Sequence, residues 1–157
     1  MNDSFPTFDE ELFNLQQVIE RLPDALGRSY VNFTDENFQQ EGFRNTGLTP
    51  WQQRKRNTGN QRALLVKTGR LRNSIRYRRE GMSVIISSDV PYAKPHNEGL
   101  NRQVTVRSHN RTRYGRTHSV NTHQRNISMP KRQFMGKSRH FEQLFSDFLD
   151  RELSKFL

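Results

Sequence analysis

The stretch that most constrains the fold of this chain is residues 108–126, "SHNRTRYGRTHSVNTHQRN", which contains almost no apolar side chains. A segment of this composition cannot bury enough surface to form a core of its own. A loop of this length inside a compact domain is uncommon and usually has a function. The sequence therefore predicts a long polar arm or hairpin tip here, with the core built from the segments on either side.

The two ends of the chain read as helices. In "FDEELFNLQQVIERL" (8–22) apolar residues recur at helical spacing, and acids occupy the first turn, where the helix dipole favours them. Pro23 follows and suits the first position of a second helix, "PDALGRSYVNF". An amphipathic stripe over 138–157, which includes Phe156, predicts a terminal helix.

The middle of the chain reads as short strands. Thr68 is placed to cap a helical turn that passes into a strand near Ile75, although strand alternation fits the same residues nearly as well. Gly81 reads as a hairpin turn, and "MSVIISSD" (82–89) as the returning strand, partly buried on both faces. "QVTVRS" (103–108) alternates cleanly and predicts a half-exposed strand.

These elements predict an α+β fold with N-terminal helices, a small antiparallel β-sheet with a long polar arm or hairpin, and a C-terminal amphipathic helix. A length of 157 residues suits a single domain, and only 31% of the residues are hydrophobic, so part of the surface is expected to be extended or buried against partners. We divide the domain into an acidic helical part (1–40), a loop and sheet (41–107), a basic polar arm (108–126), and a return strand with the C-terminal helix (127–157).

Charge is sorted along the chain. Residues 1–41 hold nine acids and two bases, residues 42–79 hold eleven bases and no acid, and residues 99–141 hold ten bases and no acid. The first segment is net −7 and the remainder net +17, which gives the overall +10. Three interpretations stay open: a surface that follows nucleic-acid phosphates, opposite charges that fix head-to-tail contact between identical subunits, and a solvated charged surface.

The arm offers the clearest candidates for contact. Its arginines, with a tyrosine among them, suit either a phosphate backbone or the surface of a neighbouring subunit on which the arm orders during assembly. Two arginines of the 68–75 region join them as candidates. The full set of candidate subunit or DNA contacts is Arg70, Arg72, Arg107, Arg111, Arg113, Tyr114, Arg116 and Arg125.

The sequence contains no constellation suited to catalysis. Asp89 and Glu98 are the only acids between Glu80 and Glu142, so carboxylates cannot converge on a cation there. The arm histidines match no usual zinc spacing, and no cysteine, phosphate loop or nucleophile elbow is present. No apolar run is long enough to span a membrane. We therefore expect no catalytic, cofactor or metal residues, no enzyme activity and no membrane contact.

Four segments of the chain are distinctive when taken together: "FQQEGFRNTGLTPWQQRK" (38–55), "LLVKTGRLRNSI" (64–75), "VPYAKPHNEG" (90–99) and "MPKRQFMGKS" (129–138). Their order and spacing resemble the phage virion-morphogenesis, or tail-completion, family of long-tailed bacteriophages. The family's elements fall on Trp51, Thr68, Gly69, Leu71, Ser74, Ile75, Tyr92, Ala93, His96, Gly99, Arg132, Phe134 and Gly136. We interpret most of these residues as fold determinants: Trp51 pins a loop to the core, Tyr92 and Ala93 pack inward, and Gly99 ends a strand.

The resemblance implies a structural protein that forms a homo-oligomeric ring, often a hexamer, at the head–tail junction or tail end. Such a ring completes the tail or neck so that capsid and tail join, and its partners are other neck, connector or tail proteins and the passing DNA. The protein would belong to the virion and, during assembly, to the host cytoplasm. In a ring, the acidic N-terminal helices of one subunit face a basic surface of the next. The alternative is a basic nucleic-acid-binding module that uses the 107–125 arm.

Overall fold

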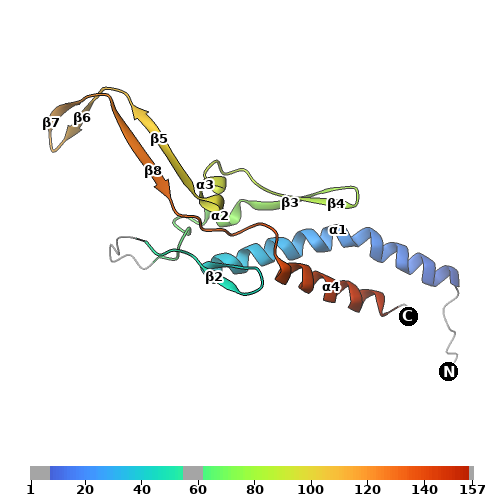
Figure 1. Ribbon diagram of the computed structural model, residues 1–157. Coiled ribbons are helices and arrows are strands. Elements are labelled where there is room, and N and C mark those ends of the chain that lie inside the picture. The colour runs from blue at the N-terminus through green and yellow to red at the C-terminus, as the bar shows by residue number, and fades with distance from the viewer. Residues whose placement is uncertain (1–7, 55–61, 156–157) are drawn as a thin grey trace.

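The computed structural model describes residues 8–54 and 62–155 (Figure 1). The fold is α+β, as the sequence predicts, with helices at both ends and short antiparallel strands between them. The elements in order are α1 (Phe8–Gln39), β1 (Gly42–Arg44), β2 (Leu48–Pro50), α2 (Arg70–Asn73), β3 (Ile75–Glu80), β4 (Ser83–Ser88), α3 (Ala93–Glu98), β5 (Leu100–Val106), β6 (His109–Arg113), β7 (Arg116–Val120), β8 (His123–Met129) and α4 (Arg139–Leu153).

The N-terminal region is one helix, so the prediction of a second helix starting at Pro23 is wrong. Pro23 lies buried inside α1 and removes one backbone hydrogen bond there. The apolar stripe nevertheless continues in phase from Leu22 through Leu26 to Tyr30 and Phe33. Apolar residues before and after Pro23 pack against the rest of the body, and this packing outweighs the low helix propensity of proline. The helix therefore continues through the proline. The acidic first turn of the helix is confirmed.

The strands form four separate two-stranded antiparallel ladders rather than one sheet. The first, β1–β2, lies where the sequence reads as loop. In the second, Glu80 pairs with Ser83 across a two-residue turn, and the positive φ of 60° at Gly81 suits a type II′ hairpin, as predicted. The prediction that β4 is partly buried on both faces is wrong: half-buried and exposed residues alternate along the strand, and Ile85 on the outer face is 39% exposed. One face of this hairpin covers α1 and the other is open to solvent.

Two local predictions from the family motifs need correction. The residue that precedes α2 is Gly69, with φ 74°, and the Thr68 hydroxyl accepts only a 3.4 Å bond from the Arg70 N–H. The passage into a strand at Ile75 is confirmed. Residues 93–98 form helix α3 rather than a strand; Ala93 is buried, whereas Tyr92 is 41% exposed. Tyr92 caps α3 and Ala93 is its first residue, and of the two only the alanine packs into the core.

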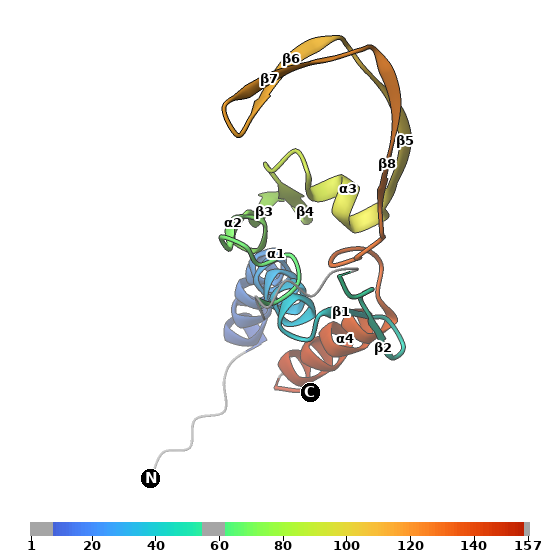
Figure 2. The same cartoon turned by 90° about the vertical axis from the view of Figure 1, so that its left-hand side faces the viewer.

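In the body, α1 lies between the β3–β4 hairpin and α4 (Figures 1 and 2). The larger core cluster packs beneath the C-terminal half of α1 and consists of Phe38, Trp51, Leu64, Leu71, Ile75, Val90, Ala93 and Phe134. A second cluster of Phe33, Phe43 and Phe141 joins α1 to α4. No residue from 8 to 22 is buried, so the first four turns of α1 extend beyond the core.

The segment from 130 to 138 has no regular secondary structure, yet it runs through the core. Side chains from other elements satisfy its backbone instead of a neighbouring strand. These bonds are Tyr30 Oη to Gly136 O (2.8 Å), Asn37 Nδ2 to Phe134 O (3.2 Å), Trp51 Nε1 to Gln133 O (2.6 Å), and Phe134 N and Met135 N to Asn97 Oδ1 (2.9 and 3.0 Å). The predicted anchoring role of Trp51 is confirmed, because its side chain is buried and bonded to this segment.

Ser138 ends that segment and begins α4, as the sequence predicts. Its Oγ accepts the Phe141 N–H at 3.1 Å and donates to the Arg44 carbonyl at 2.7 Å. Residues 156–157 of the predicted helix, with Phe156, lie outside the described residues.

We expect Ser138→Ala to lower the free energy of unfolding by about 1–2 kcal/mol, because the helix loses its cap and a buried carbonyl loses its donor. Chemical denaturation followed by circular dichroism measures the change. Ser146→Ala is the matched control: Ser146 is exposed in the middle of α4 and alanine is the better helix former. Equal stability of the Ser138 and Ser146 variants would contradict the capping role.

Candidate functional site: the basic arm, the basic cavity and the acidic helix end

The predicted polar arm is a two-stranded β-hairpin that projects from the body (Figure 1) and curls over it (Figure 2). It is longer than the polar stretch: β5 pairs with β8 from Leu100↔Met129 to Val106↔His123, and β6 pairs with β7 beyond a break. At the tip, Tyr114 and Gly115 both have positive φ, 51° and 74°, which is the pattern of a type I′ turn. We call residues 100–129 the arm.

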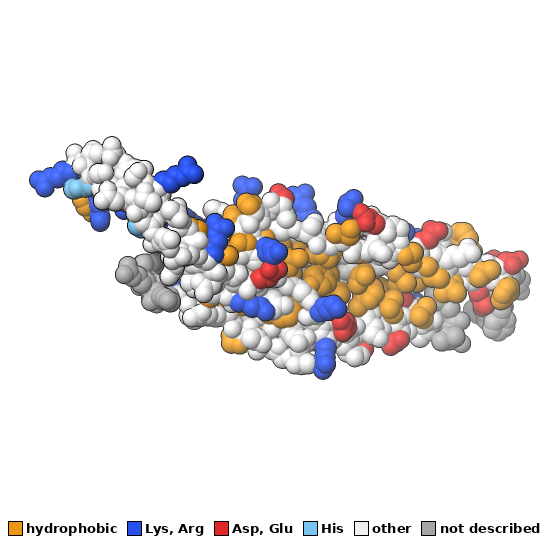
Figure 3. All heavy atoms as spheres, turned by 45° about the horizontal axis from the view of Figure 1, so that its top comes forward, with side chains coloured by type: hydrophobic (Ala, Val, Ile, Leu, Met, Phe, Trp, Pro, Cys, Tyr) orange, Lys and Arg blue, Asp and Glu red, His pale blue; other side chains and the backbone are white. Residues whose placement is uncertain are grey.

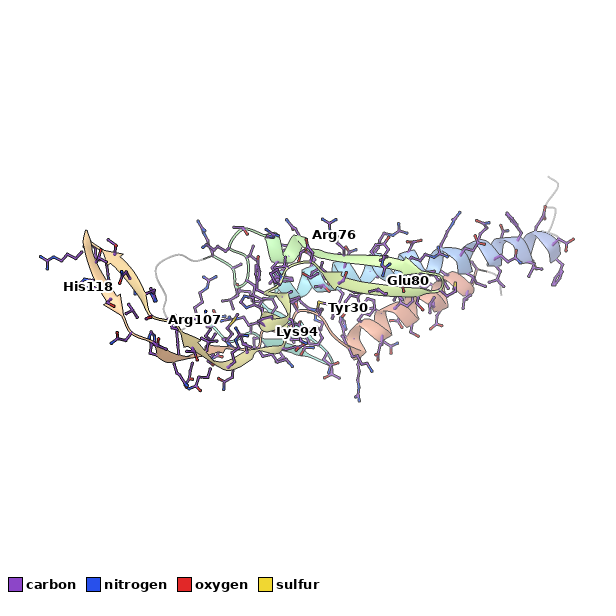
Figure 4. The ribbon with its side chains drawn as sticks, turned by 90° about the horizontal axis from the view of Figure 1, so that it is seen from above. Tyr30, Arg76, Glu80, Lys94, Arg107 and His118 are labelled. Atoms are coloured by element: carbon purple, nitrogen blue, oxygen red, sulfur yellow. The ribbon has the colours of Figure 1, made fainter. Side chains whose placement is uncertain are left out.

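The arm carries six arginines and no acid. No carboxylate of the described chain pairs with any of them. Figure 4 labels Arg107 at the break between the two ladders and His118 near the tip. Tyr114 is 90% exposed, and the Arg113 guanidinium lies 5.1 Å from its ring centre. The five predicted contact arginines of the arm and Tyr114 are therefore all exposed on one projecting element.

One face of the arm near its base carries five apolar side chains beside two exposed arginines, Arg102 and Arg125. The register places Leu100, Val104 and Val106 on the same face as Ile127 and Met129. All five side chains are only half-buried. A two-stranded ribbon is marginally stable by itself, and an apolar face stabilises it only when something covers that face. The arm thus presents an incompletely covered apolar base and an exposed basic tip.

The two candidate arginines outside the arm differ in their surroundings. The Arg72 guanidinium donates to both carboxylate oxygens of Asp35, with Nη2 2.6 Å from Oδ2. These hydrogen bonds lower the pKa of Asp35 and tie α2 to α1. Arg70, two residues earlier, is exposed and has no carboxylate partner among the described residues. Arg72 therefore serves the fold of its own subunit, whereas Arg70 is available for contact.

The family-motif residues divide into two groups. Trp51, Leu71, Ser74, Ile75, Ala93 and Phe134 are buried and build the core. The exposed or half-buried members Thr68, Tyr92, His96 and Arg132 line a cavity of about 550 Å³ together with other residues of the motif segments. All four motif segments contribute to this cavity, which the sequence did not predict.

We call this cavity the basic cavity, because its lining contains four cationic side chains and no carboxylate among the described residues. The cations are Arg54, Lys67, Arg70 and Arg132, and Leu64, Leu65 and Leu71 supply apolar surface. Arg54 donates to the carbonyls of Arg62 and Ala63, both at 2.9 Å, and Arg132 Nε donates to Gln52 O at 2.9 Å. Burial, and then the charge of Arg54, lower the pKa of Arg132. The cavity holds excess positive charge.

His96 lies at the edge of this cavity in a cationic setting. Burial lowers its pKa, and the nearby Arg132 lowers it further. Its Nδ1 is buried and has no hydrogen-bond partner among the residues that the structure describes. The Tyr92 ring packs edge-on with a centroid distance of 6.0 Å, and the Arg132 N–H donates to the His96 carbonyl at 2.8 Å. The imidazole is therefore neutral at neutral pH.

The opposite end of the molecule has the complementary character. The first turn of α1 contains Asp9, Glu10 and Glu11. Phe8 is 76% exposed and Phe13 59%, with Leu12 and Ile19 also exposed. Figure 3 shows acidic and hydrophobic side chains gathered toward this end, and basic side chains over the arm at the other. We call residues 8–20 the acidic helix end; apolar side chains exposed in such a group mark a contact surface.

Within the described ranges 8–54 and 62–155, no group of three or more His, Asp or Glu side chains is placed to hold a metal ion. The helices in those ranges also include none that is long and apolar enough to cross a membrane. The sites that the structure does show are charged and apolar surfaces suited to binding.

The profile of the phage virion morphogenesis family matches residues 8–154. The chain belongs to the phage virion morphogenesis family, which confirms the resemblance seen in its motifs. Membership implies a structural role in virion assembly and association with the virion. Comparisons with curated proteins and with solved structures give no match.

We expect the free energy of unfolding to fall as the pH drops below about 6.5, in part because of His96. The unfolded histidine binds its proton near that pH, whereas the folded one binds it only at lower pH. Between the two pKa values the unfolded state holds more protons, so stability is lost as the pH falls through this window. Urea denaturation from pH 8 to pH 5 measures the profile. His96→Gln should flatten it, and parallel profiles for the two proteins would contradict this assignment.

Proposed function

We propose that this protein is a ring-forming structural subunit that completes the tail or neck of a long-tailed phage and joins head to tail. The main observation that supports this proposal is the arm. It leaves the body with a half-covered apolar face and unpaired arginines, and a neighbouring subunit supplies the surface that its own subunit lacks. Family membership supports a structural role over catalysis.

The separation of charge supports contacts between unlike faces of identical subunits. The acidic helix end lies at one end of the molecule and the arm at the other (Figures 1 and 3). Such heterologous contacts close into a ring when the rotation between subunits divides a full turn. The proposed assembly is a hexamer at the head–tail junction or tail end, formed in the host cytoplasm and then built into the virion. Its further partners are neck, connector or tail proteins and the DNA that passes through.

A specific observation favours one alternative. Tyr114 is 90% exposed at the tip of an acid-free strand pair, beside Arg113. Aromatic rings among arginines bind single-stranded nucleic acid by stacking and by phosphate contact. A basic nucleic-acid-binding module that uses residues 107–125 is therefore the second candidate function.

We expect the purified protein to form a discrete multimer in light scattering over a range of concentrations. Because exposed charges are screened by salt, raising the salt concentration should shift the mass toward the monomer. The matched variant replaces residues 107–122 with Asn-Gly, which joins the paired residues Val106 and His123 through a two-residue turn. This variant should keep its helical signal and lose the multimer.

A protein that stays monomeric at every concentration, and that retards single-stranded DNA at low salt, would contradict the ring and favour the alternative. A multimer that survives removal of residues 107–122 would show that the outer part of the arm does not hold the assembly together.

A further inference from the structure

The basic cavity requires an occupant that combines negative charge with apolar surface. Lys67 and Arg70 have no carboxylate partner in the described chain, and His96 Nδ1 lacks a hydrogen-bond partner there. The leucines of the lining supply an apolar wall beside these groups. Lys67 and Arg70 are exposed, and a carboxylate would give each of them a charge-assisted hydrogen bond, which is stronger than a neutral one.

A protein segment fits this chemistry better than a nucleic-acid backbone. Phosphates contact cations well, but they leave an apolar wall uncovered, and a concave site of about 550 Å³ suits inserted side chains. The exposed arginines of the arm, which follow a projecting ribbon, are the better match for a backbone of regularly spaced phosphates. The cavity therefore favours an acidic and apolar peptide surface.

The chain itself contains such a surface. On α1, Asp9, Leu12 and Phe13 are spaced i, i+3 and i+4, so they share one face of the helix. The leucine and the phenylalanine are exposed, and no described cation pairs with Asp9 or Glu11. This face offers a carboxylate beside two apolar side chains, which is the combination that the cavity lacks.

The two surfaces of one molecule do not meet. Helix α1 starts at the end of the body remote from α2 and α3, which flank the cavity (Figures 1 and 4). It continues as one helix to Gln39, so its first turns cannot fold back onto the cavity. The contact has to be made between two copies.

We propose that the basic cavity is a socket for the acidic helix end of a second copy of this chain. Asp9 of the incoming helix pairs with Lys67 and Arg70, and Leu12 and Phe13 of the same helix face cover the leucines of the lining. The contact joins unlike faces and repeats from subunit to subunit. It rests on the proposed ring and specifies one of its interfaces.

Charge reversal tests the socket. The cavity variant Lys67→Glu with Arg70→Glu and the helix variant Asp9→Arg should each lose the multimer, because like charges then face each other. Combining the three substitutions in one chain should restore it. Mixing the two variants in equal amounts should also restore it, since each variant then carries the charge that the other's reversed surface needs. Arg76→Glu with Lys94→Glu, on exposed positions of β3 and α3, is the matched control and should leave the mass unchanged.

The outcomes separate this proposal from the ring itself. A wild-type multimer that is indifferent to both reversals overturns the socket and leaves the ring standing. A wild-type monomer at all concentrations overturns both. If the cavity variant instead loses affinity for DNA while its multimer persists, the cavity is a phosphate site and the socket is wrong.

A covalent trap gives an independent test, because the natural chain contains no cysteine. Phe13→Cys with Lys67→Cys should form disulfides between copies under mild oxidation and give a ladder on a non-reducing gel. Phe13→Cys with Arg76→Cys is the control and should remain largely monomeric on the gel. Equal ladders from the two pairs would overturn the socket.

Discussion

The rest of the structure depends on one irregular segment, residues 130–138, whose backbone groups are buried without a strand beside them. A buried peptide group needs a hydrogen-bond partner, and here Tyr30, Asn37, Trp51 and Asn97 supply it. The same segment connects the end of the arm to the first residue of α4. Fixing it therefore fixes the base of the arm against α1. At the other root of the arm, Gly99 has φ 82°, and a Cβ there would lie 3.2 Å from the Lys131 nitrogen, so the two roots run close together.

Local patterns predicted much of this fold. The helical stripe, the Gly81 turn, the passage into a strand at Ile75 and the start of the last helix near Ser138 depend on neighbouring residues, so periodicity and turn chemistry reveal them. The wrong predictions concern places where contacts between residues far apart in the sequence determine the structure. Pro23 reads as a helix start, although the uninterrupted stripe beyond it indicated one helix. The partners of the 130–138 segment come from positions about 35 to 105 residues away, and no spacing rule connects Asn37 or Tyr30 to a particular carbonyl.

The candidate surfaces were predictable to different degrees. The arm was predictable because the composition of residues 108–126 excludes a hydrophobic core in that segment. All of its candidate contact residues lie on the same projecting ribbon. The basic cavity was not predictable, because its cations come from separate segments between Arg54 and Arg132 that only the fold brings together. The motif residues nevertheless held the signal: the buried ones position α2 and α3, and the exposed ones line the space between them. Arg72 shows why an exposed contact cannot be predicted from charge alone. Its guanidinium binds Asp35 of the same subunit, almost forty residues earlier in the sequence.

The net positive charge of the subunit also determines which partners a ring of this protein would bind. Pairing acidic helix ends with basic cavities places opposite charges together, but it cancels no net charge, and every subunit brings +10 to the assembly. The socket uses cations of the body, so the six arginines of the arm stay unpaired by it. A closed ring therefore keeps a basic surface whose self-repulsion grows with each subunit, and a polyanion or an acidic protein relieves it. If the proposed ring forms, contacts between unlike ends build the assembly, and the charge that they leave over selects its partner.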